Sequence, residues 1–411
     1  MKKKNVRIGC IADDFTGASD VCSFLLMEAK CLLINDVPKT KIDTDANVIV
    51  IALKIRSVSK DVAIEKVKEA IDWLESMGVD HFYDKYCSTF DSTSEGNIGP
   101  ILDYLLDRLN LTYTLVSPAL PQNQREVFNG LLFADGKLLE EGSMRNHPIT
   151  PMKDSNLVRL LNAQSKYKSY SLNHRVLYHQ QFDLMQFKQK YIKDEKFYLI
   201  PDYYEEQHGR KLMKFFSKMQ LLSGSSALIF DWYKALNGEG TKKIEYQSKE
   251  DNSKALILSG SLSNQTKSQI DDYRNLGNLI LIDTNRLSCD YTDQLLKKVQ
   301  ENPDSTLIYS ERQQTHMKAS EVAKKLEETF ADLAAKYINQ GGKKIIVAGG
   351  ETSGAVIQAL PFKAYIATKN VAPGVPILRP VDHEEIQIIL KSGNFGQKDF
   401  FERAINLMKG K

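Results

Sequence analysis

Short apolar runs alternate with amphipathic stretches through the first 120 residues of the chain. The apolar runs predict buried strands, and stretches with apolar residues at helical spacing predict helices. We expect strands at residues 6–12, 48–53, 81–83 and 113–116, and helices at residues 17–27, after the potential N-cap Ser59, and near 98–109. Strands and helices that alternate in this way predict a parallel sheet with helices on its faces.

The pattern is less regular between residues 165 and 235 and becomes regular again after a polar segment. In the irregular part we expect strands at residues 169–177, 196–201 and 226–231, and helices near 182–191 and 205–219. Residues 237–254 are polar and charged and contain two glycines, which is typical of a linker. Beyond it we expect strands at residues 255–258, 279–282, 307–309 and 344–348, and helices near 264–273, 291–301, 320–338 and 353–360.

This order predicts an α/β fold of two domains, each with a largely parallel sheet flanked by helices. The first domain is expected at residues 1–236 and the second at residues 255–411, with residues 237–254 as the linker. The chain is long enough for two domains that each have a core of their own.

Composition excludes several classes of partner. The chain has 55 basic and 52 acidic residues, so its charge gives no reason to expect binding to nucleic acid or to a membrane surface. We find no apolar run of about 18 residues that would span a membrane and no signal peptide pattern at the start. Five cysteines without a C-x-x-C pair predict reduced thiols, and we therefore expect a cytoplasmic protein.

Polar side chains follow the predicted strands of the first domain, at the edge of the sheet where α/β proteins bind ligands. Each of them has an ordinary explanation by itself, as a helix cap, a turn residue or a solvated charge. Together they suit a hydroxylated carboxylic acid, because a cation can hold the carboxylate and Asp or Asn can bond to hydroxyls. The candidates are Asp13, Asp14, Arg56, Lys85, Asp91 and Asn97.

Three glycine-containing loops follow predicted strands of the second domain. Each loop alone is as well explained by an ordinary strand-to-helix turn, but three in one domain suggest a cradle for a polyphosphate. The candidates are Ser259, Gly260 and Ser261, then Gly349, Gly350, Glu351, Thr352, Ser353 and Gly354, then Lys391, Gly393 and Gly396. The chain lacks the patterns G-x-x-x-x-G-K-[ST] and G-x-G-x-x-G, which disfavours a P-loop protein and a standard dinucleotide-binding protein.

Two of these segments resemble motifs of the four-carbon acid sugar kinase family. Residues 12–18 (ADDFTGA) resemble the opening motif of the family, and residues 349–354 (GGETSG) resemble its C-terminal motif. Residues 85–99 and 144–148 (MRNHP) resemble the 3-oxo-tetronate kinase branch, and the second of these adds Asn146 and His147 to the substrate-binding candidates. Phe90 and residues 94–95 depart from the corresponding segment of erythronate and threonate kinases.

The resemblance implies a sugar-acid domain, a nucleotide domain and transfer of a phosphoryl group from ATP to the C4 hydroxyl of 3-oxo-tetronate. It also implies Mg²⁺ at the phosphates, with ligands that the sequence does not identify. We expect Asp14 to orient or deprotonate the hydroxyl, with Asp13 as the rival residue. Glu351 has two open roles, in reaching Mg²⁺ through water or in favouring the start of a helix.

Two other functions stay open at this point. The chain could be a D-erythronate or D-threonate 4-kinase of the same family, or a non-catalytic sensor of sugar acids, although a sensor needs no polyphosphate site. A nicotinamide-dependent dehydrogenase is disfavoured because the G-x-G-x-x-G pattern is missing. The chain could also act as a homo-oligomer, and the sequence does not fix the number of copies.

Overall fold

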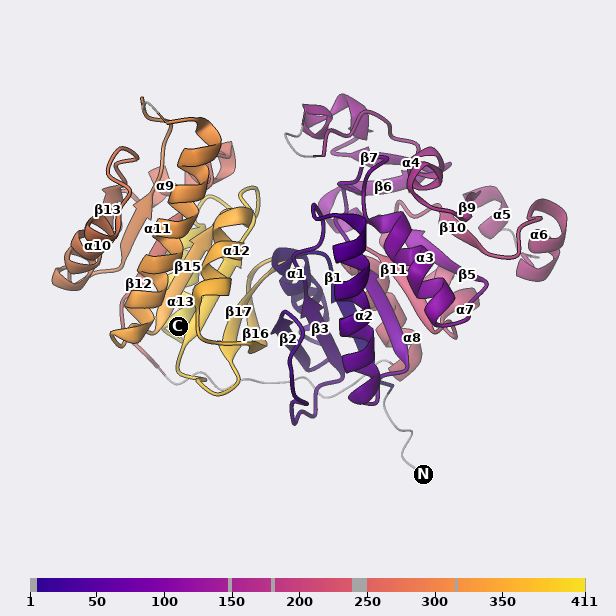
Figure 1. The fold of residues 1–411 in the computed structure, drawn as a ribbon, viewed down its shortest axis with the longest axis horizontal. Coiled ribbons are helices and arrows are strands. Elements are labelled where there is room, and N and C mark those ends of the chain that lie inside the picture. The colour runs from indigo at the N-terminus through magenta and orange to yellow at the C-terminus, as the bar shows by residue number, and fades with distance from the viewer. Residues whose placement is uncertain (1–5, 147–149, 179–181, 239–249, 315–316, 411) are drawn as a thin grey trace. The chain divides into compact units, whose positions relative to one another are not determined.

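A computed structural model describes residues 6–146, 150–178, 182–238, 250–314 and 317–410. The described residues divide into two compact units: residues 6–21 and 36–238 form the first, and residues 22–35 and 250–410 form the second. Each unit contains a mostly parallel sheet with helices packed on it, which confirms the predicted α/β class (Figure 1). Within the described residues, no helix has the length and apolar character needed to cross a membrane.

The sheet of the first unit consists of seven parallel strands in the order β3-β1-β4-β11-β5-β10-β9. Their bounds are β1 Ile8–Ala12, β3 Val48–Ala52, β4 His81–Lys85, β5 Tyr113–Ser117, β9 Lys168–Leu172, β10 Phe197–Pro201 and β11 Leu221–Gly224. Their register aligns the ends of neighbouring strands, since Ala12 lies opposite both Ala52 and Lys85, and Gly224 lies opposite Lys85 and Ser117. The loops that leave these ends therefore start side by side.

Helices cover both faces of this sheet (Figure 1). Helices α2 and α3 pack against each other, as do α7 and α8. The buried residues of α2 include Ala63, Val67, Ile71 and Leu74 at helical spacing, and Ser59 is its N-cap residue, as expected, although its side chain makes no capping hydrogen bond. The helices are α1 Phe15–Leu25, which begins in this unit, α2 Lys60–Ser76, α3 Ile98–Arg108, α4 Leu157–Gln164, α5 His174–Leu177, α6 Leu184–Tyr191, α7 Glu206–Phe216 and α8 Ser226–Asn237.

A small antiparallel sheet, which the sequence did not predict, also belongs to the first unit. It consists of β6 Arg125–Phe128, β7 Leu131–Ala134 and the two-residue β8 Lys137–Leu138. Short 3₁₀ helices lie beside it at Pro121–Asn123, Leu139–Glu141 and Ser143–Asn146.

The expected strand at residues 226–231 is wrong. These residues open α8, and the strand β11 ends just before them at Gly224. Six of the first seven residues of α8 are buried, including Leu228, Ile229 and Trp232. A helix buried on most sides shows no amphipathic period, so a short apolar run in it cannot be distinguished from a strand.

The sheet of the second unit has the order β13-β14-β12-β15-β18-β17-β16-β2. The first five strands in this order (β13, β14, β12, β15 and β18) run parallel to one another. Strands β17, β16 and β2 then continue the sheet, each antiparallel to the strand before it. Helices α11 and α12 pack together on it, while residues of α9 and α13 share an apolar core with the strands (Figure 1). The strands are β2 Cys31–Asn35, β12 Ala255–Ser259, β13 Asn278–Leu281, β14 Thr306–Tyr309, β15 Lys344–Ala348, β16 Ala364–Ala372, β17 Val375–Pro380 and β18 Gln387–Lys391. The helices are α9 Asn264–Tyr273, α10 Cys289–Glu301, α11 Ala319–Asn339, α12 Gly350–Ala359 and α13 Phe400–Met408.

Strand β2 comes from the first tenth of the chain but belongs to the second unit. Leu33 lies opposite Tyr365 of β16, and Ile34 lies opposite Ala364. The side chain of Ser23 is hydrogen-bonded to Asn370 and to the backbone of Gly374, which fixes the residues before the strand. Residues 22–35 thus form part of the second unit, a feature that a division at residue 236 does not include.

Candidate functional site

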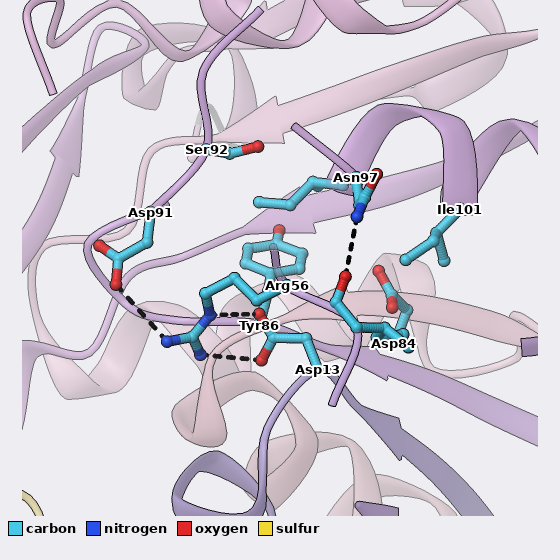
Figure 2. Close-up of a pocket in the computed structure, with 10 residues that line it drawn as sticks. Asp13, Arg56, Asp84, Tyr86, Asp91, Ser92, Asn97 and Ile101 are labelled. Atoms are coloured by element: carbon cyan, nitrogen blue, oxygen red, sulfur yellow. Dashed lines mark hydrogen bonds and ion pairs between the residues drawn. The ribbon is translucent and has the colours of Figure 1, made fainter. Parts of the chain in front are cut away.

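Arg56 joins three acidic side chains at the carboxyl end of the first unit's sheet. Its Nε and Nη2 atoms donate to the two carboxylate oxygens of Asp13 over 2.7 and 2.9 Å. Nη2 also lies 2.8 Å from Oδ2 of Asp14, and Nη1 lies 3.7 Å from Oδ2 of Asp91. Figure 2 shows the guanidinium group between Asp13 and Asp91. We call these four residues the acid cluster.

The register of the sheet explains why the acid cluster forms. Asp13 follows the end of β1 and Arg56 follows the end of β3, and these two strands are neighbours whose last residues lie opposite each other. Burial raises the pKa of Asp13, while the positive charge of Arg56 opposes that rise. A two-point contact between a guanidinium and a carboxylate is among the stronger ion pairs, so Asp13 is held firmly.

Asp14 is both a helix cap and the more accessible of the two neighbouring acids. Its Oδ1 atom accepts the backbone N–H of Gly17 at 2.5 Å, in the first turn of α1. A Cβ atom on Gly17 would lie 2.7 Å from that oxygen, so this contact requires glycine. One third of the Asp14 side chain (33%) is exposed, against 12% for Asp13. Asp14 is therefore the acid that a ligand can reach more readily.

Lys85 is buried beneath the acid cluster and faces acids on several sides. Its Nζ atom donates to the backbone carbonyl of Tyr86 over 2.9 Å, and only 3% of the residue is exposed. Its charge also acts on Asp13, Asp20 and Asp84, whose pKa values burial raises and Lys85 lowers. Lys85 thus balances buried negative charge, and the structure does not place it on the pocket described below.

A strained turn presents Asp91 to Arg56. Phe90 adopts a φ of 57°, in the left-handed region that side chains with a Cβ atom rarely enter, at a cost of about 1–2 kcal/mol. Burial of its ring, which meets Tyr86 edge-on with the centroids 5.6 Å apart, offsets that cost. The hydroxyl of Thr89 donates to Oδ1 of Asp91 over 2.6 Å, which leaves Oδ2 to face Arg56.

Asn97 and Gln164 hold the loops around the acid cluster. The amide nitrogen of Asn97 donates to the backbone carbonyls of Ile55 and Val58 over 2.8 and 2.9 Å, on either side of Arg56 (Figure 2). Gln164 accepts the N–H of Gly99 over 2.8 Å, and its side-chain nitrogen donates to Ser92 and Thr93. Asn97 thus holds the loop that contains Arg56, and Gln164 holds the loop that follows Asp91.

A narrow pocket opens beside the acid cluster (Figure 2). Asp84 lines it, with its Oδ2 atom accepting the hydroxyl of Ser223 over 3.0 Å. Burial raises the pKa of Asp84 to about 7, with Asp13 adding to the rise and Ser223 and Lys85 opposing it. The pocket is lined by Asp13, Ile55, Arg56, Asp84, Tyr86, Asp91, Ser92, Asn97, Ile98 and Ile101.

The structure therefore brings together most, but not all, of the front-half candidates. Asp14 adjoins the pocket-lining residues through Arg56, whereas Lys85 is buried and is not among them. Asn146 is exposed and is not among the residues that line the pocket, and His147 lies outside the described residues. The pocket-lining candidates are Asp13, Arg56, Asp91 and Asn97.

Sequence reasoning missed Asp84 and Tyr86 as site residues. The available signal was their position, because they flank Lys85 at the end of a predicted strand and alternate residues of a strand point to the same side. An acid in the apolar run of a buried strand is uncommon by itself and could have marked Asp84.

In the second unit, the ends of three neighbouring strands lie in register. Ser259 at the end of β12 lies opposite Ala348 of β15, and Ala348 lies opposite Lys391 of β18. The backbone N–H of Gly260 bonds to the carbonyl of Ala348, and that of Gly349 bonds to the carbonyl of Lys391. The three glycine loops therefore leave the sheet side by side, which the sequence could not show because it does not give the strand order.

Close backbone approach at the first two loops requires glycine. A Cβ atom on Gly260 would lie 2.1 Å from the hydroxyl oxygen of Thr352 in the first turn of α12. Gly349 is the N-cap of α12 with a φ of 127°, a conformation that favours glycine. The hydroxyls of Ser259 and Ser353 are buried there and have no hydrogen-bond partner among the described residues. Helix N–H groups and hydroxyls of this kind can bind phosphate oxygens.

The third loop is held from behind by Lys391 and by side chains at the start of α9. The Nζ atom of Lys391 donates to the hydroxyl of Thr266 and to the carbonyl of Gly393 over 3.1 and 3.2 Å. Thr266 and Ser263 also donate to that carbonyl, both over 2.7 Å. Burial lowers the pKa of Lys391 to about 7. Lys391 is fully buried, so it supports the loop and is not an exposed binding cation.

The remaining glycine-loop candidates differ in exposure. Gly350 and Gly354 have open space where a Cβ atom would stand, and Glu351 between them is exposed. Ser261 is partly buried and would contact a Cβ atom on Gly393 at 2.4 Å, while Gly396 has a φ of 82°. Across the described ranges, no group of three or more His, Cys, Asp or Glu side chains is placed to hold a metal ion.

Two domain models match the chain. Residues 8–230 match a sugar-binding N-terminal domain, and residues 256–401 match a nucleotide-binding C-terminal domain. The first match contains the acid cluster and its pocket, and the second contains the three glycine loops.

Relatives with curated names match over nearly the whole chain. A 3-oxo-tetronate kinase of Haemophilus influenzae is 39% identical, with 97% of this chain and 98% of the relative covered. A 3-oxo-tetronate kinase of Escherichia coli is 34% identical, with coverage of 90% and 99%. Among solved structures, a Haemophilus influenzae protein is 38% identical with a TM-score of 0.79, over 97% of this chain and all of that one. A Salmonella typhimurium protein is 33% identical with a TM-score of 0.84, over 98% and 99%.

Proposed function

Because the chain belongs to the family that combines a sugar-binding N-terminal domain with a nucleotide-binding C-terminal domain, we propose that it is an ATP-dependent 3-oxo-tetronate kinase. The reaction transfers the γ-phosphoryl group of ATP to the C4 hydroxyl and yields 3-oxo-tetronate 4-phosphate and ADP. The observation that carries the proposal is the pairing of an acidic pocket in one unit with three in-register glycine loops in the other.

The second unit supplies the groups for the triphosphate. Backbone N–H groups at the start of α12 and the unpartnered hydroxyls of Ser259 and Ser353 are the proposed donors to phosphate oxygens. The glycines at 260 and 349 let the loop backbones pack closely against the Thr352 hydroxyl in the first turn of α12, because a Cβ atom at either position would collide with or crowd that hydroxyl. Lys391 keeps the third loop in place from behind.

The first unit supplies the groups for the sugar acid. We assign Asp14 as the carboxylate that orients the C4 hydroxyl and takes its proton as the new O–P bond forms and the bond from the γ-phosphorus to the β-phosphate oxygen breaks. Its exposure exceeds that of Asp13, and the two-point contact with Arg56 makes Asp13 a fixed structural partner.

Arg56 takes a different role from the carboxylate clamp that the sequence suggested. All its nitrogen atoms face the carboxylates of the acid cluster, so we propose that it positions Asp14 and offsets the repulsion among the acids. The carboxylate of the substrate then needs another cation. Asn146 and His147 stay proposed substrate contacts, as the family resemblance implies.

Mg²⁺ is proposed as the ion that accompanies the triphosphate. The described residues include no cage for a resident metal, and Glu351 is the carboxylate that belongs to the α12 loop. The ion would neutralise phosphate charge, as it does in other phosphoryl transfers. Its binding partners are therefore expected to be chiefly the phosphates and water.

An ADP-release assay with a panel of four-carbon acids tests the proposal. We expect turnover with 3-oxo-tetronate and ATP, and much slower turnover with D-erythronate and D-threonate. Faster turnover with either of those acids would instead assign the chain to the erythronate or threonate kinases. Binding of acids without any nucleotide binding, measured by calorimetry, would support the sensor.

A further inference from the structure

Two residues that line the pocket of the first unit, Tyr86 and Asn97, have buried polar side-chain atoms. The side-chain nitrogen of Asn97 is occupied by the carbonyls of Ile55 and Val58, which leaves its Oδ1 atom as an acceptor. This oxygen is buried without a hydrogen-bond partner among the described residues, whereas the buried hydroxyl of Tyr86 lies near the side chain of Ser223 and the backbone of Ser117; both Asn97 and Tyr86 line the pocket. Buried polar groups without partners are uncommon in folded proteins, so Asn97 Oδ1 suggests a place for a ligand, with the Tyr86 hydroxyl beside it in the same pocket lining.

Asp84 adds a third polar group to the same pocket. It is 5% exposed, and Ser223 of β11 donates to its Oδ2 atom. The charged groups that face it are Asp13 after β1 and Lys85 at the end of β4, and its other titratable neighbours are Tyr83 and Tyr86. Burial raises the pKa of Asp84 to about 7, so near neutral pH much of the population has a proton that it can donate.

The charges around the pocket disfavour a carboxylate at this place. Asp13 and Asp91 stand at its edge, and the guanidinium of Arg56 is already shared among the acids. A ligand carboxylate next to Asn97 Oδ1 would meet an acceptor where it needs a donor. A neutral ligand group avoids both conflicts.

A carbonyl group beside a hydroxyl group matches the three residues. The carbonyl oxygen can accept from the hydroxyl of Tyr86 and from the protonated carboxyl of Asp84, and the hydroxyl can donate to Asn97 Oδ1. The substrate under the proposed function contains this combination, since its C3 carbonyl lies between two carbon atoms that carry hydroxyls. An alcohol at C3 carries a hydroxyl proton, and this proton would compete for the same space with the hydrogens that Tyr86 and Asp84 donate to the C3 oxygen.

We infer that Asp84, Tyr86 and Asn97 form a subsite that binds the neutral hydroxyketone part of the substrate and selects 3-oxo acids over 3-hydroxy acids. This inference rests on the proposed function, because the subsite is assigned to that substrate. We call it the hydroxyketone subsite. Its Asp84 and Tyr86 members are specificity residues that were not among the candidates predicted from the sequence.

The test compares two conservative variants, Tyr86→Phe and Asp84→Asn, with the unmodified enzyme. The full chain is assayed with saturating ATP, with 3-oxo-tetronate and with D-erythronate, between pH 5.5 and 8.5. Tyr203→Phe is the matched control, because it also removes a buried tyrosine hydroxyl from the first unit but does not touch the pocket. Thermal unfolding of each variant confirms that it is folded.

Two results are expected. Tyr86→Phe should raise the KM for 3-oxo-tetronate about 3- to 10-fold, the effect of one lost hydrogen bond, and should change the KM for D-erythronate by less. In the unmodified enzyme, kcat/KM for 3-oxo-tetronate should fall as the pH rises past about 7, because Asp84 loses its proton and becomes an anion. Asp84→Asn keeps a donor without titrating, so this fall should be absent.

The inference is overturned if Tyr86→Phe alters the preference between the two acids no more than Tyr203→Phe does. It is also overturned if Asp84→Asn shows the same fall in kcat/KM as the unmodified enzyme. Either variant decides the matter if the other does not fold. An unmodified enzyme that does not phosphorylate 3-oxo-tetronate at all is a different outcome, because it refutes the proposed function and the inference falls with it.

Discussion

The two units present polar groups to a ligand in contrasting ways. In the first, charged side chains do most of the work, with Arg56 shared by three carboxylates and Lys85 buried beneath them. In the second, backbone amides, hydroxyls and the absence of side chains prepare the site, as at Gly260 and Gly349. One site is therefore defined by charge and the other by space.

This contrast indicates which changes each site can tolerate. A side-chain network should respond to an isosteric change of charge, because shape is kept while the electrostatics change. A backbone cradle should respond to one added methyl group, because the closely packed loops must then shift away from each other. The four predictions that follow exploit this difference, from the largest expected effect to the smallest.

Asp14→Asn should have the largest effect. The amide keeps the cap on Gly17, since Asn is as good an N-cap residue as Asp, but it cannot take the proton of the hydroxyl. We expect kcat to fall by about 10²- to 10⁴-fold with little change in the KM for ATP or for the sugar acid, and the unfolding temperature to fall slightly because the ion pair of Asp14 with Arg56 is lost. Steady-state kinetics and thermal unfolding measure both. Retention of full turnover would remove Asp14 from the mechanism.

Arg56→Ala should have the next largest effect. It leaves Asp13, Asp14 and Asp91 close together without their shared cation, which should raise the pKa of Asp13 further and misplace Asp14. We expect kcat/KM for the sugar acid to fall about 10- to 150-fold, while the Kd for ATP stays within about 3-fold. Arg56→Lys keeps the charge and loses the two-point contact, so its effect should be intermediate. Equal losses for both ligands would indicate a folding defect instead.

Gly260→Ala tests the site that is defined by space. The added methyl group would lie 2.1 Å from the Thr352 hydroxyl, and overpacking of this kind costs about 1–3 kcal/mol. We expect ATP to bind about 5- to 100-fold more weakly, with the KM for the sugar acid unchanged. Gly142→Ala is the control, because it adds the same group outside the proposed ATP site, where the one atom within 4 Å is a backbone oxygen at an ordinary contact distance of 3.5 Å. Similar weakening by both variants would contradict the argument from close contact.

Lys391 should give the smallest effect, a proton taken up when ATP binds. Its pKa in the folded protein is lowered from 10.5 to about 7, so between these values the folded protein holds it neutral while the unfolded chain holds it charged. Stability should therefore rise with pH across that window as far as this group is concerned. A nearby triphosphate favours the charged form, so binding at pH 8 should take up part of a proton. Calorimetry in two buffers with different ionisation enthalpies measures it, and Lys391→Met should abolish the difference.

Much of the fold could be predicted because most strands and helices have clear periods. The helix α9 and the strand β15 begin and end where their apolar patterns do. The start of α8 could not be predicted, because this part of the helix is buried on most sides and has no amphipathic period. The small sheet β6–β8 and the β16–β17 hairpin also escaped prediction, because antiparallel strands that follow each other without a helix between them interrupt the regular alternation.

The site could be predicted in its residue types but not in its contacts. Local position after a strand marked Asp13, Asp14 and Arg56, and the strand register then placed them together. That Arg56 would face acids of its own chain, and that Lys391 would be buried, depends on contacts between residues far apart in the sequence. Such contacts are set by tertiary packing, which one sequence does not reveal.

The path of strand β2 determines how this chain can be divided. A fragment that begins at residue 255 would lack the apolar strand that pairs with β16, and so would expose a long unpaired edge prone to aggregation. Proteolysis in the segment that joins the units near residue 240 would leave both pieces dependent on each other for the same reason. An independently folding second unit would instead require a rearranged gene, in which residues 22–35 are fused to one end of the second unit.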